Sequence, residues 1–482
     1  MIYNSFNFLV LFPLIFLLYY VIPAKYQKIR NWFLLLVSYA LYISWKPVFA
    51  LVLLGVTLVT YWGALFFEES GNRDDVGETS PIRRKRQVWV FALLGLLPLL
   101  VFKYYNFLNE SISEGLAAVG LQFVLPGLNW AVPVGISFFT FQAVGYMLDV
   151  YNGRIKAERN LTDYLLFVSF FPSILSGPIN KAALVLPQIK GLRTYFDYDK
   201  AVEGLKIILW GMFMKVVVAD RVALYVDTVL PNYMNYTGVT CFTASIFYTI
   251  QIYADFAGYS LMAIGVGKVL GFELTENFRR PYFSVSVTDF WHRWHISLST
   301  WLKDYIYIPL GGSRCSKKRN YWNIFVTFLV SGIWHGANWT FIVWGIWHGL
   351  FQIVEKALGQ QKCEYGALGK TIKIVITFLL VNFAWIFFRM PTLGDACGVI
   401  VHIFDLHQSM ALEITSKHIF ALMMIGTVLL FIKDWTDEFA PNKLKLFENK
   451  NRIVRWTSYL SVIILIMLTG VFDAGQFIYA NF

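Results

Sequence analysis

Residues 289–347 read DFWHRWHISLSTWLKDYIYIPLGGSRCSKKRNYWNIFVTFLVSGIWHGANWTFIVWGIW. Four of the seven histidines of the chain, His292, His295, His335 and His348, lie in this stretch or one residue beyond it. Long apolar runs of the kind that form membrane helices surround it. Ionisable groups are costly in hydrocarbon, so those found there mark functional sites. This stretch is therefore the candidate reaction centre.

The composition indicates a membrane protein. The 482 residues are 57% hydrophobic and 15% charged, whereas soluble proteins carry about 25% charged residues. Because about 20 apolar residues span a bilayer as a helix, we predict an all-α polytopic integral membrane protein. We expect a single domain, residues 1–482, with N-terminal helices in 1–130, the core in 131–360 and C-terminal helices in 361–482. The run 6–22 lacks a basic leader and a cleavage site, which indicates a retained helix.

The positive charges lie in short clusters between the apolar runs. The net charge is +11, and the clusters occupy residues 25–30, 83–86, 154–159 and 314–319. Basic loops stay on the cytoplasmic side of a membrane, so we expect the N-terminus outside and no binding of nucleic acid. The four cysteines show no metal-ligand spacing, and we interpret them as structural thiols.

The apolar runs predict about eleven transmembrane or re-entrant helices. The segment 162–180 should be interrupted by Pro172 and Gly177, and the long run 238–271 should break near Asp255 and Gly258. No internal repeat is visible, which argues against the plan of many transporters. The remaining expected helices lie at residues 6–22, 31–46, 48–67, 88–107, 131–151, 202–229, 322–334, 338–357, 371–389, 418–433 and 456–472.

The first half of the central stretch predicts an amphipathic helix that begins at Phe290 after a cap at Thr288 or Asp289. Aromatic and apolar side chains recur on one face, and histidine, serine and lysine recur on its neighbour. So charged a helix should lie at the interface or enter from the cytoplasm and line a cavity. The candidate lining residues in this half are Trp291, Arg293, Trp294, Ser299, Lys303 and Asp304.

The second half of the stretch places His335 among small residues, roughly in the middle of an expected span. A neutral imidazole is a natural general base at pH 7, and Trp334 and Asn338 are candidate lining residues beside it. The alternative is a hydrogen-bonded core histidine that holds two helices together. For His295, the alternative is an interfacial side chain at the level of the lipid headgroups.

A zinc site is the weaker interpretation of these histidines. His292 and His295 have no carboxylate partner in an HExxH-type motif, so we expect no bound metal. His348 is interpreted as a packing or cavity residue. The three histidines near the C-terminal loop, His402, His407 and His418, suggest no partner.

The chain resembles the membrane-bound O-acyltransferase family, and within it the bacterial branch that acetylates alginate, with D-alanyl-teichoic acid transfer proteins as further relatives. The resemblance is carried by the segments DFWHRWHISLSTWLKDYIYIPLGG, SGIWHGANWTFIVWGIWHGL, VPVGISFFTFQAVGYMLDVY (132–151), SFFPSILSGPI (169–179) and QIYADFAGYSLMAIGVGKVLGFELTENFRRPY (251–282). It implies a ring of helices around a tunnel that joins a cytoplasmic donor entrance to an extracytoplasmic acceptor site. It also implies that His335 of the WHG motif is catalytic and that His295 of RWHISLS lies close to the same tunnel.

The resemblance further implies an O-acyltransferase of the bacterial cytoplasmic membrane. The enzyme would move an acyl group, acetyl first, from acetyl-CoA or another acyl thioester to an exported or cell-surface polysaccharide. No cofactor would be bound. Expected partners are membrane lipid, the polysaccharide and an extracytoplasmic SGNH-type acetyltransferase. Two alternatives remain: D-alanyl transfer from an acyl-carrier protein, which the basic loop 314–319 would suit, and a non-enzymatic transporter.

Overall fold

The computed structural model describes residues 3, 5–74, 81–121, 125–174, 177–191, 196–360, 366–405, 407, 409–414, 416–440 and 447–472. All regular secondary structure in these residues is helical, which confirms the all-α class. The chain forms two compact units: Met1–Gly204 with Val266–Thr275, and Leu205–Gly265 with Glu276–Phe482. All four histidines of the central stretch belong to the second unit.

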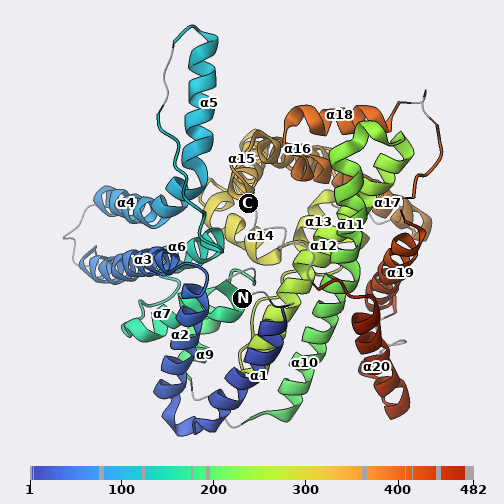
Figure 1. The fold of residues 1–482 in the computed structure, drawn as a ribbon. Helices are drawn as coiled ribbons and strands as arrows, with labels where there is room; N and C mark the ends of the chain where they lie inside the picture. The colour runs from blue at the N-terminus through green and yellow to red at the C-terminus, as the bar shows by residue number, and fades with distance from the viewer. Residues whose placement is uncertain are drawn as a thin grey trace. The chain divides into compact units, whose positions relative to one another are not determined.

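In the first unit, α3 packs against α4 and α6, and α2 packs against α7 (Figure 1). A π-helical turn, Leu100–Tyr104, joins α4 to α5. The helices of this unit are α1 (Phe6–Val21), α2 (Gln27–Ile43), α3 (Pro47–Asp74), α4 (Pro81–Leu99), α5 (Tyr105–Ala118), α6 (Ile136–Tyr151), α7 (Leu161–Ser169), α8 (Phe171–Ile174) and α9 (Ala182–Lys190).

The second unit contains the central stretch and most of α10 and α12, which begin and end, respectively, in the first unit. Its most extensive helix pairing is between α15 and α16, which form a hairpin. The helices are α10 (Tyr198–Met212), α11 (Asp220–Val229), α12 (Gly238–Val269), α13 (Val287–Arg293), α14 (Ile296–Leu302), α15 (Lys317–His335), α16 (Trp339–Ala357), α17 (Ala367–Arg389), α18 (Leu393–Ile403), α19 (Lys417–Phe439) and α20 (Arg452–Thr469).

Five helices of the described residues are long and apolar enough to cross a membrane: Pro47–Glu69, Ile82–Ala118, Ala367–Arg389, Lys417–Phe439 and Arg452–Thr469. The helices Asn7–Val21 and Ala24–Ile43 meet at an angle of 103°. Counted together as one broken span, they would add a sixth membrane crossing. These helices coincide with apolar runs of the sequence. The larger number of about eleven transmembrane or re-entrant segments stays a prediction.

The expected break in the run 238–271 is wrong. α12 continues without interruption from Gly238 to Val269. A Cβ atom on Gly258 would lie 2.8 Å from the carbonyl oxygen of Gly211. The glycine therefore permits α10 and α12 to cross at close range and does not interrupt the helix. The expected interruption of 162–180 is confirmed, but it falls at Phe170, between α7 and α8, and Pro172 lies inside α8.

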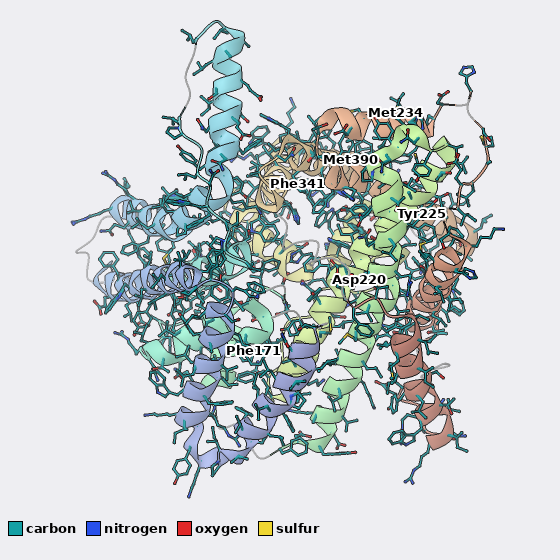
Figure 2. The ribbon with its side chains drawn as sticks, viewed as in Figure 1. Phe171, Asp220, Tyr225, Met234, Phe341 and Met390 are labelled. Atoms are coloured by element: carbon teal, nitrogen blue, oxygen red, sulfur yellow. The ribbon has the colours of Figure 1, made fainter. Side chains whose placement is uncertain are left out.

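A buried group of three charges lies beside this crossing. The Lys215 ammonium is 2.6 Å from a carboxylate oxygen of Asp220 and 2.7 Å from one of Asp255, and the three side chains are 2%, 5% and 2% exposed. Lys215 lies in the π-helical turn Phe213–Ala219, and Asp220 begins α11 (Figure 2). A π-helical turn aligns residues five apart, so it places these two side chains together. The ion pairs connect α11 to α12.

Candidate active site

The helix α13 is fixed at its N-terminus by α16. The carboxylate of Glu355 accepts hydrogen bonds from the backbone N–H of Val287 at 2.6 Å and of Thr288 at 3.0 Å. Ser286 is the N-cap, and its hydroxyl accepts from the N–H of Asp289. The expected cap at Thr288 or Asp289 is therefore wrong, and the helix begins three residues before Phe290.

The expected continuous helix after Phe290 is also wrong, because the chain turns sharply at His295. α13 ends at Arg293 and α14 begins at Ile296. His295 has a φ of 44°, in the left-handed region, which is uncommon for residues other than glycine and marks local strain. Helical periodicity across this segment is therefore not maintained, and Trp294 and His295 lie between two short helices.

Asn277 holds the turn at His295. Its side-chain oxygen is 3.2 Å from Nδ1 of His295 and accepts from the backbone N–H of Ser297 at 3.1 Å and the Ser297 hydroxyl at 2.8 Å. Its carbonyl oxygen accepts from the N–H of Ile296 at 2.9 Å. These groups are buried. Asn277 was not among the expected site residues, although it lies in the resemblance segment 251–282.

Burial also sets the charge state of His295. The side chain is fully buried, and α13 and α14 lie outside the five candidate membrane helices. Burial lowers the pKa of His295 from its ordinary value of 6.5 to about 3, because the interior disfavours the imidazolium ion. The imidazole is therefore neutral at physiological pH.

His335 is the last residue of α15, immediately before a tight turn into α16. The two helices cross at Gly332 and Gly345, where a Cβ on Gly345 would lie 2.4 Å from the carbonyl oxygen of Phe328. A Cβ on Gly336 would lie 2.1 Å from the ring of Phe341, which stands at the start of α16 (Figure 2). Glycine is thus required at these positions because α15 and α16 pack too closely to admit a side chain. The turn at Gly336 places His335 at the end of α15.

Aromatic rings surround the imidazole of His335, which is 2% exposed. Its centroid lies 4.7 Å from that of Trp344, 4.9 Å from that of Trp334 and 5.3 Å from that of Phe388, all at steep interplanar angles. Trp334 also contacts His295, with ring centroids 5.9 Å apart. The structure therefore brings both histidines into contact with one tryptophan.

His348 and the tryptophans of α13 form the adjoining packing layer. His348 is buried, and its ring contacts Trp291 and Trp344 at centroid distances of 5.2 and 4.9 Å. Trp294 is buried and packs against Trp385 at 5.0 Å. This placement agrees with the interpretation of His348 as a packing residue. His292 is exposed, so it does not join the other three.

The charged candidates Arg293, Lys303 and Asp304 have different surroundings. Arg293 forms ion pairs with Asp289 at 2.9 Å and Glu438 at 2.8 Å, and it thereby ties α13 to α19. Lys303 is exposed and Asp304 half-buried in the π-helical turn Lys303–Tyr307. These positions show Arg293 anchoring a helix, a role that sequence spacing did not indicate.

The two remaining candidates have local structural bonds. The Ser299 hydroxyl donates to the carbonyl oxygen of Trp294 at 3.2 Å. Asn338 caps α16 by accepting from the N–H of Thr340 at 2.9 Å and donates to the carbonyl oxygen of Pro391 at 2.8 Å. In the part of the chain that the structure describes, no group of three or more His, Cys, Asp or Glu side chains could hold a metal ion.

Comparison with known proteins identifies the class of protein that carries this pair of buried histidines, His295 and His335. Residues 154–390 match the membrane-bound O-acyltransferase family. The chain is 39% identical over 434 residues to the "probable alginate O-acetylase AlgI" of Pseudomonas aeruginosa, covering 89% of this chain and 80% of that protein.

Two further relatives extend the comparison. The protein of the same name from Pseudomonas syringae pv. tomato is 41% identical over 400 residues, or 82% of this chain and 74% of that protein. The peptidoglycan O-acetyltransferase of Helicobacter pylori is 33% identical over 417 residues, or 80% and 76%. The chain therefore belongs to the membrane-bound O-acyltransferase family. It is a multi-pass membrane enzyme, which excludes the transporter alternative.

Proposed function

We propose that this enzyme moves an acetyl group from a cytoplasmic thioester to a hydroxyl on the outer side of the membrane, for O-acetylation of an exported or cell-surface polysaccharide. The observation that carries the proposal is the burial of His335 against Trp334, which also contacts His295, so that two imidazoles share one water-poor environment. The relatives named above act on alginate and on peptidoglycan. They share acetyl transfer to a polysaccharide, and the proposal is made at that level.

His335 acts as the general base in the proposed reaction. Its imidazole takes the proton of the acceptor hydroxyl while the hydroxyl oxygen forms a bond to the carbonyl carbon of the thioester. The carbon–sulfur bond then breaks, and the imidazolium of His335 returns the proton to the leaving thiolate, which restores the neutral base. The aromatic rings around His335 keep water from hydrolysing the thioester.

His295 orients the acyl donor, and the tryptophans Trp291, Trp294 and Trp334 form the wall of the tunnel. Because Arg293 is bound to Asp289 and Glu438, its contribution is to hold α13 in place. Ser299, Lys303, Asp304 and Asn338 line the approaches to the tunnel. No metal takes part in the reaction.

The charge distribution supports the orientation of the chain. The basic clusters at 25–30, 83–86, 154–159 and 314–319 face the cytoplasm, with the N-terminus outside, in the bacterial cytoplasmic membrane. Acetyl-CoA or another acyl thioester approaches as a substrate from the basic side, and no nucleic acid is involved. An extracytoplasmic SGNH-type acetyltransferase receives the acetyl group or assists its transfer to the polysaccharide.

Mass spectrometry of surface polysaccharide tests the proposal in cells that carry the wild type, His335→Ala, His418→Ala or no copy of the gene. His418 is exposed and serves as the matched histidine control. We expect the acetyl groups to disappear in the deletion strain and in His335→Ala and to persist in His418→Ala. Normal acetylation by His335→Ala would refute the assignment of the base.

D-alanyl transfer is the second candidate, supported by the exposed basic residues just before α15 and in its first turn, which would suit an acidic carrier protein. The same strains distinguish it. Loss of D-alanine from teichoic acid, with unchanged polysaccharide acetylation, would establish the carrier-protein reaction and leave the histidine assignment in place.

A further inference from the structure

The orientation of the Asn277 side-chain amide is determined by its neighbours. The backbone N–H of Ser297 can only donate, and it lies 3.1 Å from Oδ1 of Asn277. At the other end of the amide, Nδ2 donates to the hydroxyl of Ser260 at 3.3 Å. A flipped amide would set two N–H donors against each other, so the atom that faces His295 is the oxygen.

The tautomer of His295 follows from this orientation. An amide oxygen can only accept, and it is 3.2 Å from Nδ1 of His295, so Nδ1 carries the hydrogen. A neutral imidazole has one N–H and one lone pair, which leaves the lone pair on Nε2. The second proton of an imidazolium is disfavoured because His295 is fully buried.

Asn277 also holds the backbone that presents the ring. It bonds to three consecutive residues: the ring of His295, the N–H of Ile296 and both the N–H and hydroxyl of Ser297. His295 has the left-handed backbone conformation that few side chains adopt. One side chain therefore controls the position and the protonation pattern of the imidazole together.

We propose that Asn277 is a positioning residue that fixes His295 as its Nδ1–H tautomer, and that His295 acts on substrate as a hydrogen-bond acceptor through Nε2; the second clause rests on the proposed acyl transfer. Polarising the carbonyl of a thioester requires a hydrogen-bond donor, and Nε2 carries no hydrogen in this tautomer. His295 instead accepts a hydrogen bond from an O–H or N–H group of the substrate. A different group polarises the thioester carbonyl.

Three variants test this assignment in membrane vesicles that hold the full chain, with radiolabelled acetyl-CoA as the donor probe and the pH varied from about 6 to 9. In Asn277→Asp, a carboxylate faces the Nδ1–H and favours the imidazolium ion. As the pH is lowered, we therefore expect the transfer rate of this variant to begin falling at a higher pH than that of the wild type. Asn277→Leu removes the acceptor altogether and should lower the rate about 100-fold at every pH.

Asn382 provides the matched control for a buried asparagine. It is fully buried, its oxygen accepts from the Thr249 hydroxyl at 2.7 Å, and its nitrogen donates to the Ser245 hydroxyl at 3.0 Å. Asn382→Asp introduces the same charge without a histidine partner, so its pH profile should keep the wild-type shape. An Asn277→Asp enzyme with the wild-type pH profile would overturn the proposal.

Nitrogen-15 NMR of histidine-labelled wild-type protein measures the tautomer directly and does not depend on the Asn277 variants. The His295 signals are identified by their loss in His295→Gln, and we expect the proton on Nδ1 and a lone pair on Nε2. A proton on Nε2 and none on Nδ1 would overturn the assignment. Wild-type vesicles that transfer no acyl group to polysaccharide would instead reject the proposed function, while the NMR result on Asn277 and His295 would still be decisive.

Discussion

Nε1 of Trp291 donates a hydrogen bond of 3.3 Å to Nδ1 of His348. An indole nitrogen can only donate, so Nδ1 of His348 holds the lone pair and Nε2 holds the hydrogen. His295 has the reverse arrangement, with its hydrogen on Nδ1 toward Asn277. Two buried histidines of one aromatic cluster thus carry opposite tautomers, each selected by a single neighbour.

Replacing Trp291 by Phe should destabilise the protein while preserving an aromatic ring. The change leaves the buried Nδ1 of His348 without its donor, which costs about 1–3 kcal/mol. Thermal unfolding in detergent measures the effect, and Trp322→Phe is the control because Trp322 is 54% exposed. Equal unfolding temperatures for the two variants would show that the bond contributes nothing.

Replacing Gly336 by Ala should overpack the turn behind His335. The new methyl group would overlap the ring of Phe341, and such overpacking typically costs about 1–3 kcal/mol. We expect reduced stability and reduced acetylation, both partly restored in Gly336→Ala/Phe341→Leu. Gly55→Ala is the control, since a Cβ there meets nothing within 4 Å. A double variant no better than the single one would contradict the steric explanation.

Replacing Glu355 by Gln should loosen the start of α13. Glutamine has one acceptor oxygen for the two backbone N–H groups, of Val287 and Thr288, that the carboxylate now accepts, so one bond is lost. Bonds to a charged acceptor contribute about 1.5–3 kcal/mol. Hydrogen exchange, followed by mass spectrometry, should become faster over residues 286–293. Unchanged exchange in that peptide would mean that α16 does not hold the helix at this point.

Replacing Lys215 by Met should be the most damaging change in the second unit outside the histidines. It leaves the carboxylates of Asp220 and Asp255 in an apolar interior, and removing one partner of a buried pair costs about 3–5 kcal/mol. Asp220→Asn removes a negative charge and keeps the bond to Asp255, so it should be milder. Yield of folded protein by size-exclusion chromatography ranks them, and the opposite order would refute this account.

The sequence was sufficient to predict the helical class and the family, and it singled out His295 and His335, which both contact Trp334 in the structure. It did not predict the turn at His295, because the hydrogen bonds that stabilise the left-handed backbone come from Asn277, eighteen positions earlier. Periodicity describes a helix from its own residues and carries no information about such a partner. Arg293 and Glu438 are 145 positions apart in the sequence, so their ion pair was missed for the same reason.

Gly258 illustrates the converse error. This glycine suggested an interruption of the helix. In the structure its missing side chain instead leaves room for α10, which approaches α12 closely there. Composition cannot distinguish a glycine that breaks a helix from one that admits another helix. The expected roles of the two principal histidines remain predictions that the experiments above address.

The unbroken course of α12 makes it a rigid link between two groups. Asp255 belongs to the buried charge group with Lys215, while the next residue, Phe256, packs its ring against that of His295 with centroids 4.7 Å apart. Ser260, one turn later, receives the bond from Asn277. A rotation of α12 that separated Asp255 from Lys215 would also move Phe256 and Ser260 away from His295 and Asn277. The buried ion pairs and the alignment of the imidazole are therefore mechanically coupled through this helix.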